Sequence, residues 1–449
     1  MLHSHEGLDR AGGFARAGLF APLRRRDFRL LWSGMCVSLL GDGAFIVAIA
    51  WQVYALSNAA TAMSMVGIAM TVPTIVFLLV GGVASDRMDR RRIMLAADVT
   101  RMCAVGLLAA LSITGALELW HVIVLVVFYG SGAAFFAPAF DAITPELLPA
   151  HELAQANALD QVVRPVALRL AGPAIGGVLV GAFGPGTAFA LDAATFVLSA
   201  VALLVMRRPP QRPASGGASL TGDLREGWRF VRSRAWLWAT FASAAVAYLL
   251  FMGPVEVLLP LLVKNDVGGS ATDLGLVFAA GGLGSVACAV MLGRGGLPRR
   301  DITFMYAAWT LATLAVAGYG LAGAVWQLML VSVAFNALET AGTIVWATLK
   351  QHNVPASMLG RVSSLDWLVS ISLTPLSFAL AGPLALTFGT EATLAGAGCL
   401  GGLLVLAFLF LPGVRAVERP GNHSASGRAL NERERDALEF LNDGSGGGR

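Results

Sequence analysis

Residues 207–217 of the chain read RRPPQRPASGG, a polar stretch between two long apolar halves. Together with the residues up to 236, this stretch contains three prolines and seven arginines. Such a composition is typical of a solvated connector, because prolines and clustered charges resist packing into a helix bundle. The sequence therefore predicts a boundary between two halves at residues 207–236.

Six apolar segments lie on each side of this connector. A membrane-spanning helix needs about 20 mainly apolar residues, and these segments have that length. In the first half the segments cover 30–54, 63–85, 93–115, 119–140, 159–183 and 187–206. In the second half they cover 237–261, 273–292, 302–322, 325–348, 364–388 and 392–412. We therefore predict an all-α membrane protein with twelve transmembrane helices in two six-helix halves, 30–206 and 237–412, with tails at 1–29 and 413–449.

The composition excludes several classes of protein. Hydrophobic residues make up 56% of the 449 residues and charged residues only 13%, which excludes both an ordinary water-soluble enzyme and a disordered chain. The formal charge of +4 is too small to suggest binding to nucleic acid. The cysteines stand singly in apolar stretches and the histidines show no ligand spacing, so we predict neither a metal site nor a cofactor.

The positive charges indicate how the chain is oriented in the membrane. Cytoplasmic loops of membrane proteins carry an excess of lysine and arginine. Among the tails and connections of this chain, the positive residues fall on the side of the N-terminal tail, with Lys264 as the exception. We therefore expect both tails and the connector to lie in the cytoplasm. The first 29 residues are polar, unlike a cleavable signal peptide, so we expect the first span to be retained.

The two halves also repeat short patterns at offsets of 206 to 208 residues. The matched residues are Pro149 with Pro355, Leu153 with Leu359, Leu159-Asp160 with Leu365-Asp366, Gly67 with Gly275, and Arg91-Arg92 with Arg299-Arg300. Two six-helix halves in the same orientation, joined by a long connector, are the parallel-repeat arrangement of major facilitator transporters. In such transporters the binding site lies between the halves near the bilayer midplane, and rocking of the halves gives alternating access.

Residues 82–92, GVASDRMDRRR, connect the second and third segments and resemble the cytoplasmic loop signature of the major facilitator superfamily. The resemblance implies that Asp86 and Arg90 form a charge gate that holds the outward-facing state closed inside. Asp89 stands where the family usually has glycine, and the alternative role of this loop is a solvated, positively charged anchor. The expected motif residues are Gly82, which would let two helices approach closely, and Asp86, Arg87, Arg90, Arg91 and Arg92.

Asp42 lies at the middle of the first segment, between Gly41 and Gly43, which are expected to loosen the helix. A charge at the centre of a bilayer costs a few kcal/mol or more, so ionisable residues there are seldom kept without a use. A carboxyl group in this position could bind and release a proton as the site alternates between the two aqueous sides. The alternative is a buried acid that is satisfied by a neighbouring helix, with Arg101 as its partner.

Glu256, in the seventh segment, is the second candidate for proton or substrate coupling. Pro254 and Pro260 flank it and are expected to break the helix and free backbone carbonyls, as in a gate or a binding cavity. Its position near the outer end of the segment leaves open that the carboxylate is simply hydrated. Glu339 lies deeper, in the tenth segment, whereas Asp192 lies near an outer end and is expected to reach the headgroup region.

Two further patterns concern helix packing. Asp98 and Arg101 stand three residues apart on the third segment, the spacing of an intrahelical ion pair, and we interpret them as structural. Small residues in the fifth segment resemble the Gly-Pro motif of exporters in this superfamily and would permit close helix contact. The motif residues are Gly172, Pro173, Gly176 and Gly177. Arg169 precedes them where the family motif is more apolar.

Other stretches resemble one branch of the superfamily, the enterobactin-exporter and macrolide-efflux type. They are Leu40-Gly41-Asp42, Leu147-Leu148-Pro149, Asn157-Ala158-Leu159, Gly172-Pro173, Ala193-Ala194-Thr195-Phe196 and Glu226-Gly227-Trp228-Arg229-Phe230. The resemblance covers about residues 20 to 412. It implies export of a small amphipathic molecule, such as a siderophore or an antibiotic, driven by inward proton flow across the bacterial cytoplasmic membrane.

The sequence thus predicts a proton-coupled exporter in which Asp42 is the first and Glu256 the second candidate coupling residue. Its partners would be a small-molecule substrate, protons and the lipid bilayer, and we expect a monomer. The same fold would also support a proton-coupled importer. An enzyme acting on lipid would need a nucleophile or a metal cluster, which the sequence lacks. A non-transporting scaffold would need neither the repeated halves nor the intramembrane acid.

Overall fold

The computed structural model describes residues 20–149, 152–207, 220–295, 298 and 300–418. All regular structure within these residues is helical. Twelve helices of the described part, several of them built from consecutive elements, are long and apolar enough to cross a membrane. This confirms the predicted all-α fold with twelve transmembrane helices.

The first six spans are formed by residues 26–205 and are preceded by one short turn of helix. The elements are η1 (Ala21–Arg24), α2 (Arg26–Leu56), α3 (Ala60–Arg87), α4 (Arg90–Ile113), α5 (Leu119–Leu147), α6 (Leu153–Pro165), η3 (Val166–Ala171), α7 (Gly172–Phe183) and α8 (Pro185–Val205). The elements α6, η3 and α7 follow one another without a break and make the fifth span. We call α2 to α8 the N-half.

The other six spans follow the short helix α9 (Leu220–Arg232). The elements are α10 (Ala235–Gly253), η4 (Pro254–Leu258), α11 (Leu259–Leu261), η5 (Leu262–Asp266), α12 (Ala271–Gly295), α13 (Asp301–Tyr319), α14 (Val325–Asn353), α15 (Ala356–Ser372), α16 (Thr374–Phe388), α17 (Thr390–Leu409) and η6 (Val414–Glu418). The elements α10 to η5 together make the seventh span, and α15 with α16 makes the eleventh. We call α10 to α17 the C-half.

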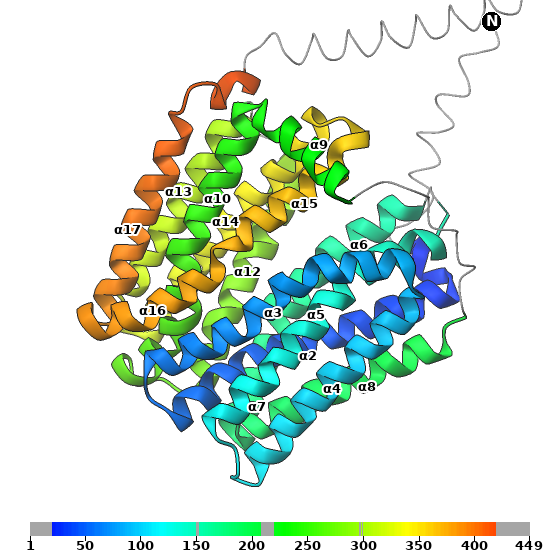
Figure 1. Cartoon of the computed structure of the whole chain (residues 1–449). Coiled ribbons are helices and arrows are strands. Elements are labelled where there is room, and N and C mark those ends of the chain that lie inside the picture. Colours follow the sequence, from blue (N-terminus) through cyan, green and yellow to red (C-terminus); the bar gives the residue numbers. More distant parts are fainter. Residues whose placement is uncertain (1–19, 150–151, 208–219, 296–297, 299, 419–449) are drawn as a thin grey trace, which may run out of the picture.

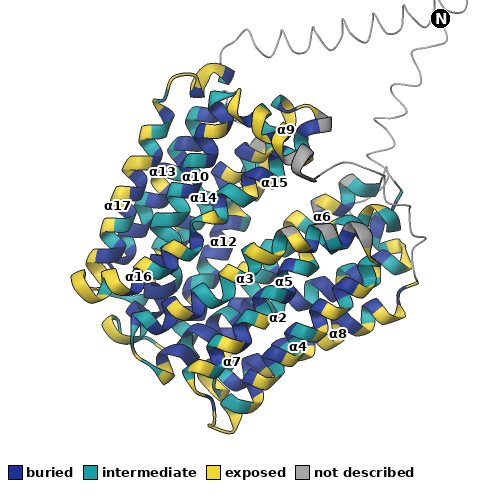
Figure 2. Cartoon of the chain, in the orientation of Figure 1, coloured by how far each residue is buried: buried dark blue, intermediate teal, exposed yellow. Residues whose placement is uncertain are grey.

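The outer surface of the bundle is apolar, which is the reverse of a water-soluble protein. Figure 2 shows exposed residues along the outward faces of helices such as α17 and α8. Among them are large aliphatic side chains that are more than half exposed, for example Met291, Leu403 and Leu198. An apolar surface of this extent is stable only in contact with lipid, so the outer faces of the helices are those of a membrane-embedded bundle.

Each half packs mainly within itself, and two helix pairs join the halves. In these pairs α7 contacts α12, and α3 contacts α16. Gly177 of α7 lies against Gly275 of α12, so close that a Cβ atom at Gly177 would stand 2.8 Å from the Cα of Gly275. In the second pair, the backbone amide of Gly382 on α16 donates to Ser64 Oγ on α3 at 3.0 Å. Small residues are therefore what allows the two halves to touch.

The halves converge at one end of the molecule and diverge toward the other, as Figure 1 shows. We call the end that carries α9 and the turns at 88–89 and 354–355 the connector end, and the opposite end, with the turns at 57–59 and 267–270, the far end. Hydrogen bonds between the halves lie toward the far end. There the Tyr54 hydroxyl donates to the carbonyl of Val257 at 2.5 Å, and the Lys264 ammonium donates to the carbonyl of Tyr54. The described structure is thus closed at the far end.

One sequence-based expectation about a helix break is wrong. The seventh span does not break at its prolines, because Pro254 opens the π-helical turn η4 and the chain continues helically to Asp266. The helix α2 runs without interruption through Gly41 and Gly43, from Arg26 to Leu56. A π-helical turn displaces the backbone without ending the helix, and such turns are frequent at functional sites.

The contact between Gly177 and Gly275 yields a prediction about conformation. Gly177→Leu places a side chain where α7 and α12 now touch, so we expect the far end to open. Spin labels at Ala116 and Leu321, exposed on far-end turns of the two halves, would report this as a longer distance by double electron–electron resonance.

The matched control is Gly396→Leu on α17, because nothing lies within 4 Å of a Cβ atom at Gly396. This control should keep the distance of the unsubstituted protein. An unchanged distance in Gly177→Leu would show that the glycine contact does not hold the far end closed.

Candidate functional site

Asp42 lies inside the N-half and is held by two side chains from other helices. Tyr129 of α5 donates its hydroxyl hydrogen to Asp42 Oδ1 at 2.7 Å. The Arg101 guanidinium of α4 lies 3.9 Å from Asp42 Oδ2. The Asp42 side chain is 14% exposed. The structure therefore surrounds this acid with one hydrogen-bond donor and one cation, yet leaves it partly accessible.

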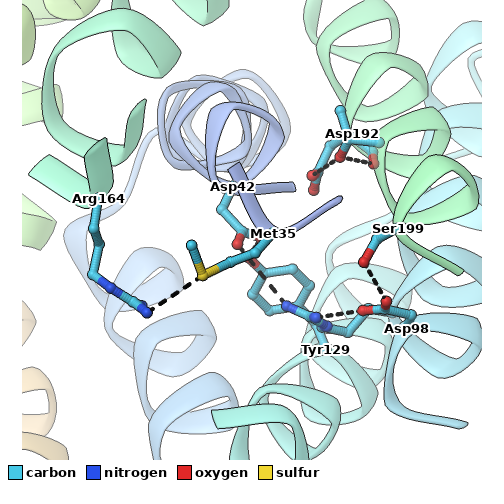
Figure 3. Close-up of polar contacts among 9 residues, drawn as sticks. Met35, Asp42, Asp98, Tyr129, Arg164, Asp192 and Ser199 are labelled. Carbon is cyan, nitrogen blue, oxygen red and sulfur yellow. Dashed lines mark hydrogen bonds and ion pairs between the residues drawn. The ribbon is translucent and has the colours of Figure 1, made fainter. Parts of the chain in front are cut away.

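Arg101 also binds Asp98, one turn earlier on the same helix. Arg101 Nη2 donates to Asp98 Oδ1 at 2.6 Å, and Ser199 of α8 donates to Asp98 Oδ2 at 2.7 Å (Figure 3). The guanidinium carbon lies 4.3 Å from the ring centre of Phe196, a cation–π contact. The ion pair that the spacing predicts is therefore present, and it is part of a larger cluster with Asp42.

Asp192 of α8 joins this cluster, contrary to the expectation that it reaches the headgroups. It is completely buried, and its carboxylate lies against Gly41, the residue before Asp42. Thr195 lies 3.4 Å from Asp192 Oδ1, whereas Oδ2 has no hydrogen-bond partner among the described residues. The expectation was wrong because α8 turns this side chain toward α2 and not toward the lipid. The position of Asp192 in its segment indicates how deep the residue lies in the membrane, but the direction of its side chain depends on how the helices pack.

The glycines beside Asp42 explain how three helices come so close. A Cβ atom at Gly41 would collide with the carboxylate of Asp192, and one at Gly43 would stand 2.8 Å from the Cα of Gly172. These glycines are therefore contact points and not flexible joints. Asp42 thus projects from a helix that is clamped between α8 on one side and the fifth span on the other.

The Gly-Pro motif of the fifth span uses both of its faces in these contacts. Gly172 and Gly176 pack on α2, the latter against the backbone of Ala44. Gly177 packs on α12, and Pro173 is buried. The motif therefore links the helix that carries Asp42 to the opposite half of the molecule.

The loop at 82–92 has only some of the expected contacts. Arg90 forms an ion pair with Glu146 of α5 and donates to the carbonyl of Ser85 at 3.1 Å. Arg91 donates to the carbonyls of Leu203 and Leu204 at 2.5 and 2.6 Å, which caps the end of α8.

Two other features of this loop concern its acids and its glycine. Asp89 accepts from the backbone amide of Arg91 at 3.0 Å and is the N-cap of α4, and Arg92 lies 3.7 Å from it. Gly82 does not make the expected helix contact, because helix α3 turns the neighbouring Gly81 toward α5 instead. The side chains of Asp86 and Arg87 lie outside the described residues, so their part in a gate stays a prediction.

Glu256 belongs to a second charged group, which lies between the halves. It sits on the π-helical turn η4 of the C-half, and Arg169 of η3 in the N-half interacts with it electrostatically. Arg169 Nη1 lies 3.3 Å from Glu339 Oε2 on α14, which makes an ion pair between the two halves. The structure thus gives a place to Arg169, which the sequence motif left unexplained.

Sequence reasoning missed several partners in these two groups. A polar residue within an apolar helix is the sequence signal that could have identified them. The residues with this signal are Tyr129, Ser199 and Glu146. Their partners could not be read from spacing, because each partner lies on a different helix.

The cluster around Arg101 yields a prediction about stability. Arg101→Gln would leave Asp98 and Asp42 buried without their cation, and removing one partner of a buried ion pair costs about 3 kcal/mol or more. We expect the thermal midpoint in detergent, followed by fluorescence-detected size-exclusion chromatography, to fall by about 5 °C or more. Arg300→Gln, at an exposed position, is the control and should leave the midpoint unchanged. Equal midpoints for both variants would show that the cluster does not stabilise the N-half.

Comparison with known proteins relates this fold to efflux transporters. A family model described as a transmembrane secretion effector matches residues 17–436. Macrolide efflux protein A of Streptococcus pyogenes is 23% identical over 375 residues, which cover 81% of this chain and 90% of that protein. Enterobactin exporter EntS of Shigella boydii is 28% identical over 398 residues, which cover 86% of this chain and 91% of the exporter.

A solved structure supports the same fold. The structure of a bacterial homologue of the iron transporter ferroportin, in its inward-facing state, superposes with a TM-score of 0.64. The superposition covers 86% of this chain and 99% of the homologue, at 17% identity. The resemblance to the enterobactin-exporter and macrolide-efflux branch is therefore confirmed. The chain belongs to the transmembrane secretion effector family of major facilitator transporters.

Proposed function

We propose that the chain exports a small amphipathic molecule in exchange for protons, and that Asp42 carries the proton. The observation that supports this most strongly is the cluster of three acids around one guanidinium in the N-half. Asp42, Asp98 and Asp192 lie on α2, α4 and α8, and Arg101 forms ion pairs with the first two.

The charge balance of this cluster favours proton binding. If all three acids were ionised, two negative charges would remain uncompensated in the bilayer core, where each costs several kcal/mol. The cluster therefore holds at least one proton in this state. Asp98 and Asp192 are completely buried, whereas Asp42 keeps 14% of its side chain exposed. Asp42 is thus the group through which a proton reaches the cluster.

The position of Asp42 also explains how its charge could affect conformation. It lies twelve residues before Tyr54 on the same helix, which corresponds to about 18 Å. Tyr54 makes the hydrogen bond to Val257 that joins the halves at the far end. Protonation of Asp42 weakens its attraction to Arg101, so α2 can shift relative to α4 and change this contact. Proton binding would in this way be coupled to opening and closing.

In the orientation that we propose, the connector end faces the cytoplasm and the structure is open to the inside. The arginines at 90, 91 and 92 lie at this end, as the positive charge of cytoplasmic loops requires. Both termini would then be cytoplasmic, in the cell membrane of a bacterium. Residues 30–206 and 237–412 would act as the two rocking domains of a monomer, and in the outward-facing state Asp86 and Arg90 would help to hold the connector end closed.

The names of the relatives support export. One is described as a macrolide efflux protein and another as an enterobactin exporter, so the substrate of this chain would be a comparable amphipathic compound. A proton-coupled importer is the alternative, because the same fold serves both directions. A non-transporting scaffold is disfavoured, because it would have no use for a partly accessible acid within the membrane.

The decisive measurement is proton flux in everted membrane vesicles that are energised to be acidic inside. Siderophores, macrolides and cationic dyes are added in turn. A compound that is exported in exchange for protons releases protons from vesicles with the unsubstituted chain. We expect Asp42→Asn, which cannot change its charge, to reduce this flux at least tenfold while expression stays normal.

Asp301→Asn is the matched control, since Asp301 lies at the start of α13, away from the cluster, and its flux should equal that of the unsubstituted chain. Normal flux in Asp42→Asn would exclude Asp42 as the proton carrier. Proton-driven uptake in right-side-out vesicles, without release in everted ones, would favour the importer.

A further inference from the structure

The C-half contains a recess whose lining includes four aromatic residues and one acid, Glu339. It has a volume of about 60 Å³ and is lined by side chains of α10, α13, α14 and α17. The aromatic lining residues are Tyr248, Phe251, Trp309 and Phe335. Their rings touch one another, since the centres of Phe251 and Tyr248 are 5.3 Å apart and those of Phe251 and Phe335 are 5.4 Å apart. A recess of this size takes at most a small head group, so the rest of a larger ligand would lie outside it.

The polar groups of the recess are arranged for a ligand. Ser243 is 1% exposed, and its hydroxyl has no hydrogen-bond partner among the described residues. Glu339, which also lines the recess, accepts from the Thr343 hydroxyl at 3.0 Å through its other oxygen. A buried hydroxyl without a partner costs free energy, which a ligand in the recess would recover.

The carboxylate of Glu339 is occupied by a cation from the opposite half. Arg169 belongs to the N-half, its side chain is 48% exposed, and its pair with Glu339 at 3.3 Å crosses from one half to the other. A cationic ligand that pairs with Glu339 would therefore compete with Arg169 for this carboxylate.

We propose that this recess binds the head group of an amphipathic cation and that Arg169 occupies the place of its charge when the transporter is empty. The proposal rests on the proposed transport function and names the substrate class. The faces of aromatic rings attract cations and repel anions, and the Glu339 carboxylate has the same preference. When the substrate pairs with Glu339, Arg169 is displaced, and one ion pair between the halves is lost. Substrate binding thereby loosens the halves.

Binding of two molecules with the same shape, one charged and one neutral, tests this site. The probes are choline, which carries a trimethylammonium head group, and 3,3-dimethylbutan-1-ol, its uncharged isostere, and binding is measured on the purified full-length chain in detergent without a proton gradient. We expect the cation to bind and the neutral compound to bind more weakly by a factor of ten or more. Equal or tighter binding of the neutral compound, or no binding of the cation, would overturn the proposal.

Substitutions then separate the roles of the two charged residues. Glu339→Gln should weaken binding of the cation at least about tenfold, because the buried counter-charge is lost. Arg169→Gln should strengthen it several-fold, because the competing guanidinium is removed, whereas Arg169→Lys should change it little. Weaker cation binding in Arg169→Gln would mean that Arg169 supports the ligand, which contradicts its assignment as a competitor.

Two further variants keep the test valid. Glu226→Gln is the matched control for Glu339→Gln. It removes the carboxylate of α9 that pairs with Arg361 of α15, away from the recess, so it should leave binding of the cation unchanged. Ser243→Leu fills the recess without changing a charge, and it should abolish binding of the cation. The site can therefore be tested even if Glu339→Gln fails to fold.

If the cation binds as expected but no compound drives proton flux, the proton-coupled function is refuted and the site stands. If other compounds drive proton flux while the cation does not bind, only the site is refuted.

Discussion

The buried guanidinium of Arg101 is the constraint on which the N-half depends. It pairs with carboxylates on two helices, Asp42 of α2 and Asp98 of α4, and Asp192 of α8 is buried against Gly41, next to Asp42. Without it, those acids would oppose the packing of the helices that carry them. With it, they hold the helices together and still leave one acid, Asp42, in partial contact with the outside. If Asp42 carries the proton, as we propose, structural stability and proton binding depend on the same group.

Close helix contacts carry this local chemistry to the rest of the molecule. Gly43 beside Asp42 lies against Gly172 of the fifth span, and Gly177 of the same span lies against Gly275 in the other half. The π-helical turn η3 lies in the same span and carries Arg169. The fifth span therefore contacts the helix that carries Asp42 and also contributes the arginine of the ion pair between the halves.

The two charged groups differ in a way that suits different tasks. The cluster around Arg101 lies within one half, is almost fully buried and contains more acids than cations. The pair of Arg169 and Glu339 lies between the halves, is more exposed and borders an aromatic recess. We propose that the first group holds a proton and that the second exchanges one cation for another.

The sequence by itself determined the twelve spans, the packing role of the Gly-Pro motif, the ion pair of Asp98 with Arg101 and the family, because hydrophobic length, residue size and local spacing are properties of short stretches. It also identified Asp42 and Glu256 as acids at unusual depth. Only the tertiary structure showed that Tyr129 binds Asp42 and that Arg169 pairs with Glu339. It also showed that Asp192 is buried, where a position in the headgroup region was expected. The physical reason is that an apolar helix has several nearly equivalent faces, and the face that meets a neighbour is chosen by packing across helices distant in the chain.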